Sequence, residues 1–273
     1  MTPLKPVIDW TRDVPASEFP DLFPTIVSQG TAKPICLEVC SGEGGSTRGL
    51  MNAGWDVIAV DNSRARLKRN PARWRVLGDA FDAIAAMGAD VDLIWAGWPC
   101  QDYSAGTRAA RAHGIATGHK RLIAAGREAM AATGTPWVIE NVEGARSELR
   151  DPVMLCGYMF DLSATDDDGT PLVMERHRLF ESSHLLVAPE HEKHPRGVQV
   201  AGSYGGARRD KNEARHVRHG GYVPSAAVQA QLLEVDWMSQ QGQYLAIPPA
   251  YSEFLGAQLL NCCCYGCESR DQI

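Results

Sequence analysis

The sequence predicts an α/β fold in which short buried strands alternate with helices. Residues 34–40 and 55–61 are apolar runs with the length of buried strands. A glycine-rich turn over residues 41–47 and a short helix over residues 48–54 join them, and Asp61 ends the second run. This β-loop-α-β arrangement is typical of folds that bind ligands at the carboxyl ends of parallel strands.

The composition is that of a single globular body. A length of 273 residues suits one domain or one and a half, and an apolar fraction of 44% can fill a sizeable core. No stretch is long and apolar enough to cross a membrane, and residues 1–5 lack a signal peptide's apolar core. We therefore expect a cytoplasmic protein with reduced cysteines. Residues 1–33 contain five prolines and no clear period, which predicts an extended N-terminal arm.

The glycine-rich turn is predicted to hold an adenosine-containing cofactor. Without side chains, Gly42, Gly44 and Gly45 let the backbone approach a ligand closely. Asp61 follows Gly42 by about twenty residues, a spacing that suits hydrogen bonds to a ribose diol. Another acid, Asp79, ends the next strand. A plain tight turn would explain the glycines alone nearly as well, but the turn and the two acids together favour a cofactor.

A candidate nucleophile follows the strand predicted over residues 91–96. Gly97 and Pro99 end that strand and place Cys100 on a loop at the carboxyl edge of the sheet. A cysteine there can present a thiolate nucleophile. A lone cysteine in such a place is more often a small apolar side chain packed under a loop, so the assignment depends on its neighbours.

The next stretch adds a predicted lid and a candidate acid. Residues 102–120 are polar and rich in glycine, the composition of a mobile lid, although a plain surface loop is the alternative. A helix over residues 121–133 and a buried strand over residues 135–139 follow. Glu140 comes directly after that strand. With a raised pKa it could act as an acid or hydrogen-bond donor beside Cys100, whereas such an acid alone is more often a loop cap.

Two arginines are predicted on one face of a strand. Residues 174–180 alternate, so Arg176 and Arg178 point to the same side, where they could bind an oxyanion or a base edge, or pair with surface acids. Three more elements are expected further on: a helix over residues 225–237, a turn over residues 245–249 and a helix over residues 251–260.

Basic residues gather in two windows of a chain whose net charge is −6. The first window contains Arg64, Arg66, Lys68, Arg69, Arg73 and Arg75. The second contains Lys193, Arg196, Arg208, Arg209, Lys211, Arg215 and Arg218. The net charge excludes a surface covered in basic groups, but each window is equally compatible with a solvated face and with phosphate contacts.

No metal site is expected. The tail contains four cysteines but a single C-x-x-C pair, Cys264 and Cys267, whereas a tetrahedral zinc site normally needs two separated pairs. The pair His191-x-x-His194 and a similar pair within residues 216–219 have no partner cysteine nearby in the sequence.

Taken together, these motifs resemble those of the DNA (cytosine-5)-methyltransferase family, in particular its compact, phage-like members. The resemblance runs from Ile35 to about Leu260. It is carried by the turn from Cys40 to Gly45, Asp61, Asp79, Gly97-Trp98-Pro99-Cys100-Gln101, Glu140-Asn141-Val142 and Arg176-His177-Arg178. Pro-Cys-Gln, Glu-Asn-Val and Arg-x-Arg in this order behind a glycine turn are highly specific.

The resemblance implies a Rossmann-like S-adenosylmethionine-dependent methyltransferase fold with a small, irregular second lobe. The cofactor contacts it implies are Ser41, Gly42, Gly44, Gly45, Asp61, Asp79, Gly97 and Pro99. It also implies that Cys100 adds to C6 of a cytosine flipped out of duplex DNA. Glu140 would hold the N3 and amine edge of the base, and Arg178, helped by Arg176, its O2 side. C5 would then take the methyl group and lose its proton.

Three departures from the family pattern stand out. Asp102-Tyr103 follow Gln101 where Pro-Phe is usual, and Glu175 stands where Gln is frequent. Residues 244–248 occupy the place of the last motif without its asparagine.

The implied organisation has four parts: an arm over residues 1–33, a catalytic domain over 34–180, a target-recognition lobe over 181–240 and a returning C-terminal segment over 241–273. DNA contacts are expected from five residues of the lobe: Arg208, Arg209, Lys211, Arg215 and Arg218. We expect a monomer whose partner is DNA. Two alternatives remain, namely C5 methylation of a free cytosine nucleotide, which would fit the acidic net charge, and a non-catalytic DNA-binding relative.

Overall fold

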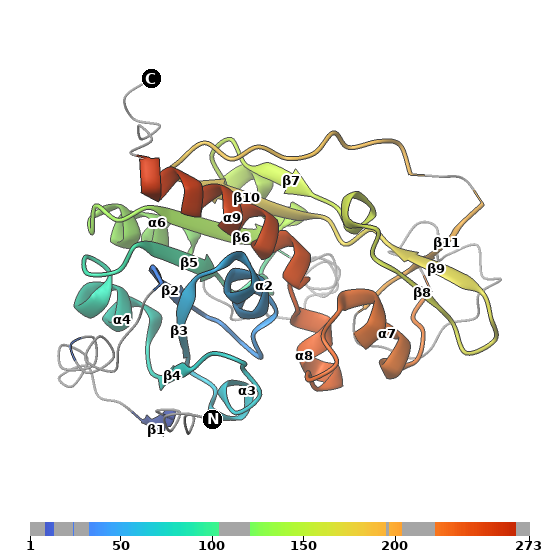
Figure 1. Ribbon diagram of the computed structural model, residues 1–273, viewed down its shortest axis with the longest axis horizontal. Coiled ribbons are helices and arrows are strands. Elements are labelled where there is room, and N and C mark those ends of the chain that lie inside the picture. Colours follow the sequence, from blue (N-terminus) through green and yellow to red (C-terminus); the bar gives the residue numbers. More distant parts are fainter. Residues whose placement is uncertain are drawn as a thin grey trace, which may run out of the picture.

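The computed structural model describes residues 9–13, 24, 33–103, 121–194, 197–203 and 222–265. Its centre is a large sheet (Figure 1). The strands of this sheet are β1 (Asp9–Asp13), β2 (Ile35–Val39), β3 (Asp56–Asp61), β4 (Trp74–Leu77), β5 (Leu93–Gly97), β6 (Trp137–Val142), β7 (Val153–Leu155) and β10 (Arg178–Ser182). Their order is β1-β4-β3-β2-β5-β6-β10-β7. Only β10 runs antiparallel to its neighbours in this described sheet, and the other neighbouring strands pair in parallel.

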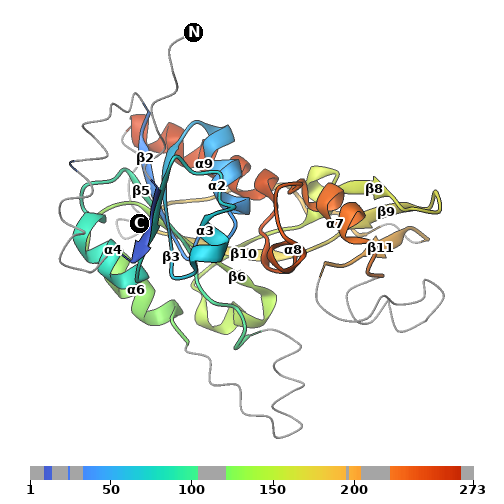
Figure 2. The same cartoon turned by 90° about the horizontal axis from the view of Figure 1, so that it is seen from below.

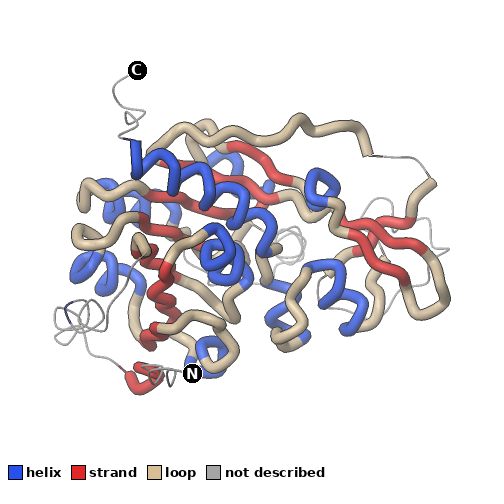
Figure 3. Tube along the Cα trace, viewed as in Figure 1, coloured by secondary structure: helices blue, strands red, loops and turns tan. Residues whose placement is uncertain are grey.

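The strand order reverses at β2. The chain passes from β2 to β3 on one side, and β5 adds to the other side of β2. Val39, the last residue of β2, pairs with Val60 of β3 and with Ala96 of β5, so the carboxyl ends of the three strands meet. Figure 3 shows the strands, in red, lying side by side between helices. Such a reversal opens a crevice above the strand ends where α/β proteins bind ligands.

Helices cover both faces of the sheet (Figure 2). The described helices are α2 (Gly45–Ala53), α3 (Arg64–Leu67), α4 (Ala80–Met87), α6 (Ile123–Ala131), α7 (Ala226–Leu233), α8 (Gln240–Leu245) and α9 (Pro249–Tyr265), with 3-10 helices η2 (Glu143–Glu148) and η3 (Gly157–Phe160). One buried cluster lies between the sheet and α4 and α6, and includes Ile84 and Met130. A second cluster lies under α2 and α9, and includes Leu50 and Leu255. The sheet is therefore buried on both sides, as its continuous apolar strands require.

Glycine allows α2 and α9 to approach closely. A Cβ atom on Gly49 would lie 2.0 Å from the Pro249 carbonyl oxygen, so no other residue fits there without displacing α9. The Trp55 indole donates a hydrogen bond to the Gly256 carbonyl at 3.0 Å. These contacts fix the C-terminal helix against the first βαβ unit.

A second, smaller sheet lies at one end of the molecule (Figure 1). It consists of β8 (Ser163–Thr165), β9 (Pro171–Met174) and β11 (Gln199–Ala201), in the order β11-β9-β8. Leu172 and Met174 of β9 and Leu232 of α7 belong to the same buried cluster as α2 and α9. The small sheet thus combines residues from before and after position 180 and packs continuously with the main body.

The structure confirms the predicted strands over 34–40, 55–61 and 91–96, and corrects four boundaries. The helix predicted over 48–54 begins at Gly45, directly after Gly44, whose left-handed backbone ends the turn. The strand predicted over 135–139 extends to Val142, because β10 pairs with it there.

The other two corrections lie later in the chain. The helix predicted over 225–237 ends at Leu233, where Glu234 adopts a left-handed backbone, and α8 precedes the turn expected at 245–249. Within the described residues, no helix has both the length and the apolar character needed to cross a bilayer.

Candidate active site

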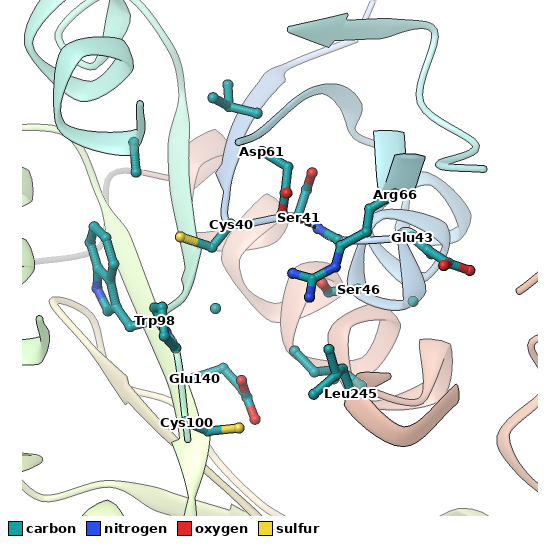
Figure 4. Close-up of a pocket in the computed structure, with 18 of the residues that line it drawn as sticks. Cys40, Ser41, Glu43, Ser46, Asp61, Arg66, Trp98, Cys100, Glu140 and Leu245 are labelled. Carbon is teal, nitrogen blue, oxygen red and sulfur yellow. Dashed lines mark hydrogen bonds between the residues drawn. The ribbon is translucent and has the colours of Figure 1, made fainter. Parts of the chain in front are cut away.

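A pocket lies above the carboxyl ends of β2, β3, β5 and β6 (Figure 4). Among the residues predicted for a functional site, those lining it are Ser41, Gly42, Gly44, Gly45, Asp61, Asp79, Gly97, Pro99, Cys100, Glu140 and Arg178. The fold therefore gathers in one crevice side chains that are up to 137 positions apart in the sequence, from Ser41 to Arg178. Arg176 is not among the residues that line the pocket.

The glycine turn forms one wall of the pocket. Gly42 has a φ of 57° and no atom lies within 4 Å of the position of a Cβ atom, so the turn is open to the pocket at this point. Gly44 has a φ of 85°, and a Cβ atom there would lie 2.4 Å from Pro71. The Ser41 hydroxyl also lines the pocket, and it is buried without a hydrogen-bond partner among the described residues. An unpartnered buried hydroxyl on a pocket wall is a group that a ligand can satisfy.

The two predicted acids are held by backbone N–H groups. Asp61 Oδ2 accepts a hydrogen bond from the Gly42 N–H at 2.9 Å, and its Oδ1 accepts one from the Ser63 N–H at 2.8 Å. Asp79 caps α4 by accepting the Phe81 N–H at 2.8 Å. Each carboxylate oxygen can accept a further hydrogen bond, so both acids are oriented by the fold and still able to bind a hydroxyl or amine in the pocket.

A buried carboxylate lies beneath the turn. Glu38 in β2 accepts hydrogen bonds from the Ser46 and Thr47 hydroxyls at the start of α2. Burial raises the pKa of Glu38 from 4.5 to about 7, although the two hydroxyls act to lower it. Sequence reasoning missed this residue, because an acid inside an apolar strand gives no sign of its partners.

The glycine turn is also tied to the C-terminal elements. Glu43 accepts hydrogen bonds from the Ser239 N–H and hydroxyl, both at 2.6 Å, and the Trp237 indole donates to the Glu43 carbonyl at 2.9 Å. This places α8, which ends at Leu245, and the following residues Ala246 and Ile247 along the pocket wall. The segment 244–248, expected as a variant of the last family motif, therefore does reach the pocket.

The Cys100 loop is fixed from two sides. Asn141 donates a hydrogen bond to the Trp98 carbonyl at 3.0 Å, and the Tyr103 N–H donates to the Cys100 carbonyl at 3.0 Å. The Trp98 ring is fully buried and packs on Gly126 of α6, where a Cβ atom would lie 2.2 Å from the indole. Cys100 thus lies on a loop whose shape is set by buried contacts.

The two residues that depart from the family pattern after Gln101 have structural partners. Asp102 forms an ion pair with Arg121 at 2.7 Å, and the Tyr103 hydroxyl donates to Glu148 at 2.8 Å. Arg121 also contacts Glu148 at 3.0 Å. The pair between Asp102 and Arg121 joins the chain just before and just after residues 104–120, which are outside the described part of the chain and contain most of the predicted lid.

Glu140 lies beside Cys100 in the pocket (Figure 4). It forms an ion pair with Arg178. The Arg178 Nε is 3.1 Å from Glu140 Oε1, with 14% and 8% of the two side chains exposed. Burial raises the pKa of Glu140, and Arg178 acts to lower it. Burial also raises the pKa of the Cys100 thiol above 9.0, and so does the charge of Glu140, whereas Arg178 lowers it. The resting site therefore holds a thiol and a carboxyl group, each with a raised pKa, beside the Arg178 guanidinium.

The strand predicted over residues 174–180 is interrupted, so the two arginines do not share a face of one strand. β9 ends at Met174, β10 begins at Arg178, and Arg176 between them has a φ of 35°. Arg176 is directed to backbone carbonyls: its Nε donates to Ala246 at 2.8 Å, and its terminal nitrogens donate to Ser203 and Tyr244, each at 3.0 Å. Arg178 faces the pocket, while Arg176 holds the C-terminal segment and the small sheet in place.

Sequence reasoning missed several pocket residues. Arg66 was placed in a basic window, but it points into the pocket from α3 (Figure 4). Phe81 and Met238 also line the pocket and carry no motif. The predicted DNA contacts Arg208, Arg209, Lys211, Arg215 and Arg218 lie outside the described residues.

Comparison with known proteins identifies the fold. No protein-family model and no curated protein sequence matches the chain. Among solved structures, the Dnmt2 methyltransferase of S. pombe matches with a TM-score of 0.50 and 12% identity, over 84% of this chain and 98% of that one. The chain shares the fold of that methyltransferase.

Two further structures match with lower TM-scores. A prophage protein of E. coli described as a DNA modification methyltransferase gives 0.48, with 14% identity over 84% of this chain and 99% of its own. The methyltransferase EhMeth of Entamoeba histolytica gives 0.47, with 10% identity over 85% and 99%. At 12% identity the likeness to the S. pombe protein concerns the fold, which is the predicted Rossmann-like α/β class. The chemistry has to be argued from the pocket itself.

Proposed function

We propose that this protein transfers a methyl group from S-adenosylmethionine to C5 of cytosine in DNA through a covalent adduct with Cys100. The observation that carries the proposal is the convergence of the glycine turn, Cys100 and the Glu140–Arg178 pair on a single pocket. The Dnmt2 fold and the family resemblance of the motifs support it.

The pocket residues fit the cofactor. The unpartnered Ser41 hydroxyl and the open face of Gly42 offer polar contacts without steric obstruction. Asp61 and Asp79 can accept hydrogen bonds from a ribose and an adenine amine, respectively. Gly97 and Pro99 complete the wall between this end of the pocket and Cys100. Bound S-adenosylmethionine would supply an activated methyl group, and the chain's own residues would prepare the base to accept it.

Cys100, Glu140 and Arg178 would share the work on the base. The Cys100 sulfur would form a bond to C6, which makes C5 electron-rich and able to accept the methyl group. Loss of the C5 proton and breakage of the S–C6 bond would then release the methylated product. Glu140, whose pKa is raised by burial, can donate a proton or hydrogen bond to N3 as negative charge develops on the ring. The Arg178 guanidinium would stabilise charge on the O2 side.

We assign Arg176 a positioning role, because its donors bind the carbonyls of Ser203, Tyr244 and Ala246. We retain the proposed catalytic domain over residues 34–180, target-recognition lobe over 181–240 and returning segment over 241–273. Contacts to DNA phosphates by Arg208, Arg209, Lys211, Arg215 and Arg218 also remain a proposal. Because a base stacked in a duplex cannot reach a thiol inside this pocket, the target cytosine would have to flip out of the helix.

The test is methyl transfer from radiolabelled S-adenosylmethionine to duplex DNA, single-stranded DNA, RNA and cytosine nucleotides. Duplex DNA is expected to be the best acceptor. Asp61→Ala is expected to weaken cofactor binding by about 1–3 kcal/mol, measured by calorimetry, because it removes a charged hydrogen-bond acceptor. Cys100→Ser is expected to bind the cofactor and transfer no methyl group. Failure to bind S-adenosylmethionine at all would overturn the proposal.

The free-nucleotide alternative makes a distinct prediction in the same assay. A cytosine nucleotide would then be methylated at least as well as duplex DNA, and the rate would depend little on salt. Binding through phosphates instead makes DNA affinity fall with salt, by about 0.9 in log–log slope for each phosphate contact. Binding of both DNA and S-adenosylmethionine without methyl transfer would favour the alternative of a non-catalytic DNA-binding protein.

A further inference from the structure

Four potential metal ligands meet in a cluster that the proposed reaction does not use. The cluster consists of Cys156, His177, His191 and His194, and their ligand atoms all lie within 4.8 Å of one another. Cys156 precedes η3, His177 lies between β9 and β10, and the other two lie in the extended segment after β10. Three separate parts of the chain therefore converge on one point.

The spacing suits a tetrahedral ion. Zinc binds nitrogen at about 2.0–2.1 Å and sulfur at about 2.3 Å, so its ligand atoms lie about 3.3–3.6 Å apart. Cys156 Sγ is 3.3 Å from His194 Nε2, which is 3.1 Å from His191 Nε2. Sub-ångström side-chain movements are enough to bring the wider pairs of the cluster to tetrahedral separations. A thiolate with three imidazoles favours zinc over magnesium or calcium, which prefer oxygen ligands.

Two carboxylates orient the imidazoles. Glu175 Oε1 is 2.8 Å from His194 Nδ1, and Glu143 Oε2 is 3.3 Å from His177 Nδ1. Both histidines therefore have Nδ1 on a carboxylate, and their Nε2 atoms remain for the cluster. Carboxylate–histidine–metal arrangements of this kind are typical of zinc sites, because the carboxylate fixes the ring and increases its basicity.

One ring nitrogen of the cluster has no hydrogen-bond partner among the described residues. His177 Nε2 is buried and has no hydrogen-bond partner among the described residues, although its ring stacks on His194 with centroids 5.2 Å apart. A buried ring nitrogen without a partner is costly, and a metal ion in the cluster would satisfy it.

The local fold prepares the sulfur atom. The 3-10 turn after Cys156 directs the backbone N–H groups of Tyr158 and Met159 at its side chain. Gly157 is required in this turn, because a Cβ atom there would lie 2.3 Å from the Met174 carbonyl oxygen. The turn therefore fixes the Cys156 sulfur beside the histidines.

We propose that Cys156, His177, His191 and His194 bind a structural zinc ion. Four protein ligands close the coordination sphere and leave no position for substrate, which is the pattern of a structural site. The ion would join the segment containing His191 and His194 to the turn that precedes Arg178, and so hold in place the chain that carries the pocket arginine. No cysteine lies near His191-x-x-His194 in the sequence, but the fold brings Cys156 from 35 positions earlier to the pair.

The experiment is metal analysis of the full chain purified from zinc-supplemented medium. About one zinc per chain is expected for the wild type. Cys156→Ser and His191→Ala are each expected to lose most of it. The matched control replaces both Cys264 and Cys267 by Ser, which should leave the zinc content unchanged. Cobalt substitution should give the visible spectrum of a tetrahedral site with sulfur-to-metal charge transfer, and Cys156→Ser should lose that charge-transfer band.

A second measurement guards against variants that simply misfold. A zinc chelator is expected to lower the melting temperature of the wild type and of the tail double variant, but not that of folded His191→Ala, which binds no ion. Wild-type protein without zinc and without a cobalt spectrum would overturn the proposal. Zinc that survives Cys156→Ser and His191→Ala but disappears with Cys264 and Cys267 would also overturn it.

Discussion

Glu140 and Arg178 act on the Cys100 thiol with opposite signs, so replacing either one should change its reactivity in a predictable direction. Burial is the main cause of the raised Cys100 pKa, the charge of Glu140 raises it further, and Arg178 lowers it. Glu140→Gln removes the negative neighbour and should lower the thiol pKa. Arg178→Met removes the positive neighbour and should raise the thiol pKa.

The size of the effect follows from the burial of the pair. Only 8% of Glu140 and 14% of Arg178 is exposed, so water screens these charges weakly. A neighbouring charge of this kind shifts a pKa by about one unit, which changes the thiolate fraction about tenfold at a pH below the pKa. A thiolate with a lower pKa is also a weaker nucleophile, and one pKa unit reduces its rate constant about threefold. Glu140→Gln should therefore react about threefold faster at Cys100.

The assay is mixed-disulfide formation with a neutral aromatic disulfide near pH 8, quantified by mass spectrometry of the Cys100 peptide. Cys40 in the same molecule is an internal control, because burial and Asp61 dominate its raised pKa and Glu140 does not contribute. Its rate should not change. The same Glu140→Gln protein should lose methyl transfer. A Cys100 rate that is unchanged or lower in Glu140→Gln would refute the electrostatic reasoning.

Two further predictions concern the framework of the pocket. Glu38 has a pKa of about 7 in the folded protein, against an ordinary value of 4.5. Between these two pH values the folded protein keeps a proton on Glu38 that the unfolded chain has released. The contribution of Glu38 to the free energy of unfolding therefore falls as the pH rises from 4.5 to 7. Glu38→Gln should remove a pH-dependent loss on the order of 3 kcal/mol, measured by urea unfolding at several pH values, and a curve parallel to the wild type would contradict this. Gly126→Ala places a methyl group 2.2 Å from the Trp98 ring and should destabilise the fold by about 1–3 kcal/mol and reduce methyl transfer. Ala125→Gly, on the exposed face of the same helix, should not reduce methyl transfer. Equal rates of methyl transfer for the two variants would show that the packing of Trp98 on Gly126 does not shape the Cys100 loop.

The strands of the central sheet could be predicted because their apolar runs are uninterrupted. The sheet is covered on both faces, so nearly every position of its central strands is buried and the sequence shows a continuous apolar run. These runs are residues 34–40, 55–61 and 91–96. The pocket residues of the glycine turn and the Cys100 loop could be predicted for the same reason: each directly follows one of these strands. Glu140 had the correct place in the pocket, although it belongs to the strand itself.

The remaining features depend on tertiary contacts that leave no local pattern. The alternation of side chains over residues 174–180 predicted a continuous strand through Arg176. The Arg176 side chain instead donates to the carbonyls of Ser203 and Ala246, and its backbone has a φ of 35°. Only glycine fits at position 45 because the Ile247 carbonyl, 202 positions later in the chain, packs against it. The Cys156 and histidine cluster was invisible because three separate segments provide its members.

The central claim is that Cys100 forms a covalent bond to C6 of a cytosine in DNA. The most direct measurement incubates the protein and S-adenosylmethionine with duplex DNA that contains 5-fluorocytosine, in which fluorine cannot leave C5 as a proton does. We expect a protein–DNA adduct that resists denaturation, with the DNA attached to Cys100 in the peptide map. We expect no adduct for Cys100→Ser. Continued methylation of ordinary DNA by Cys100→Ser, or an adduct on another residue, would contradict it.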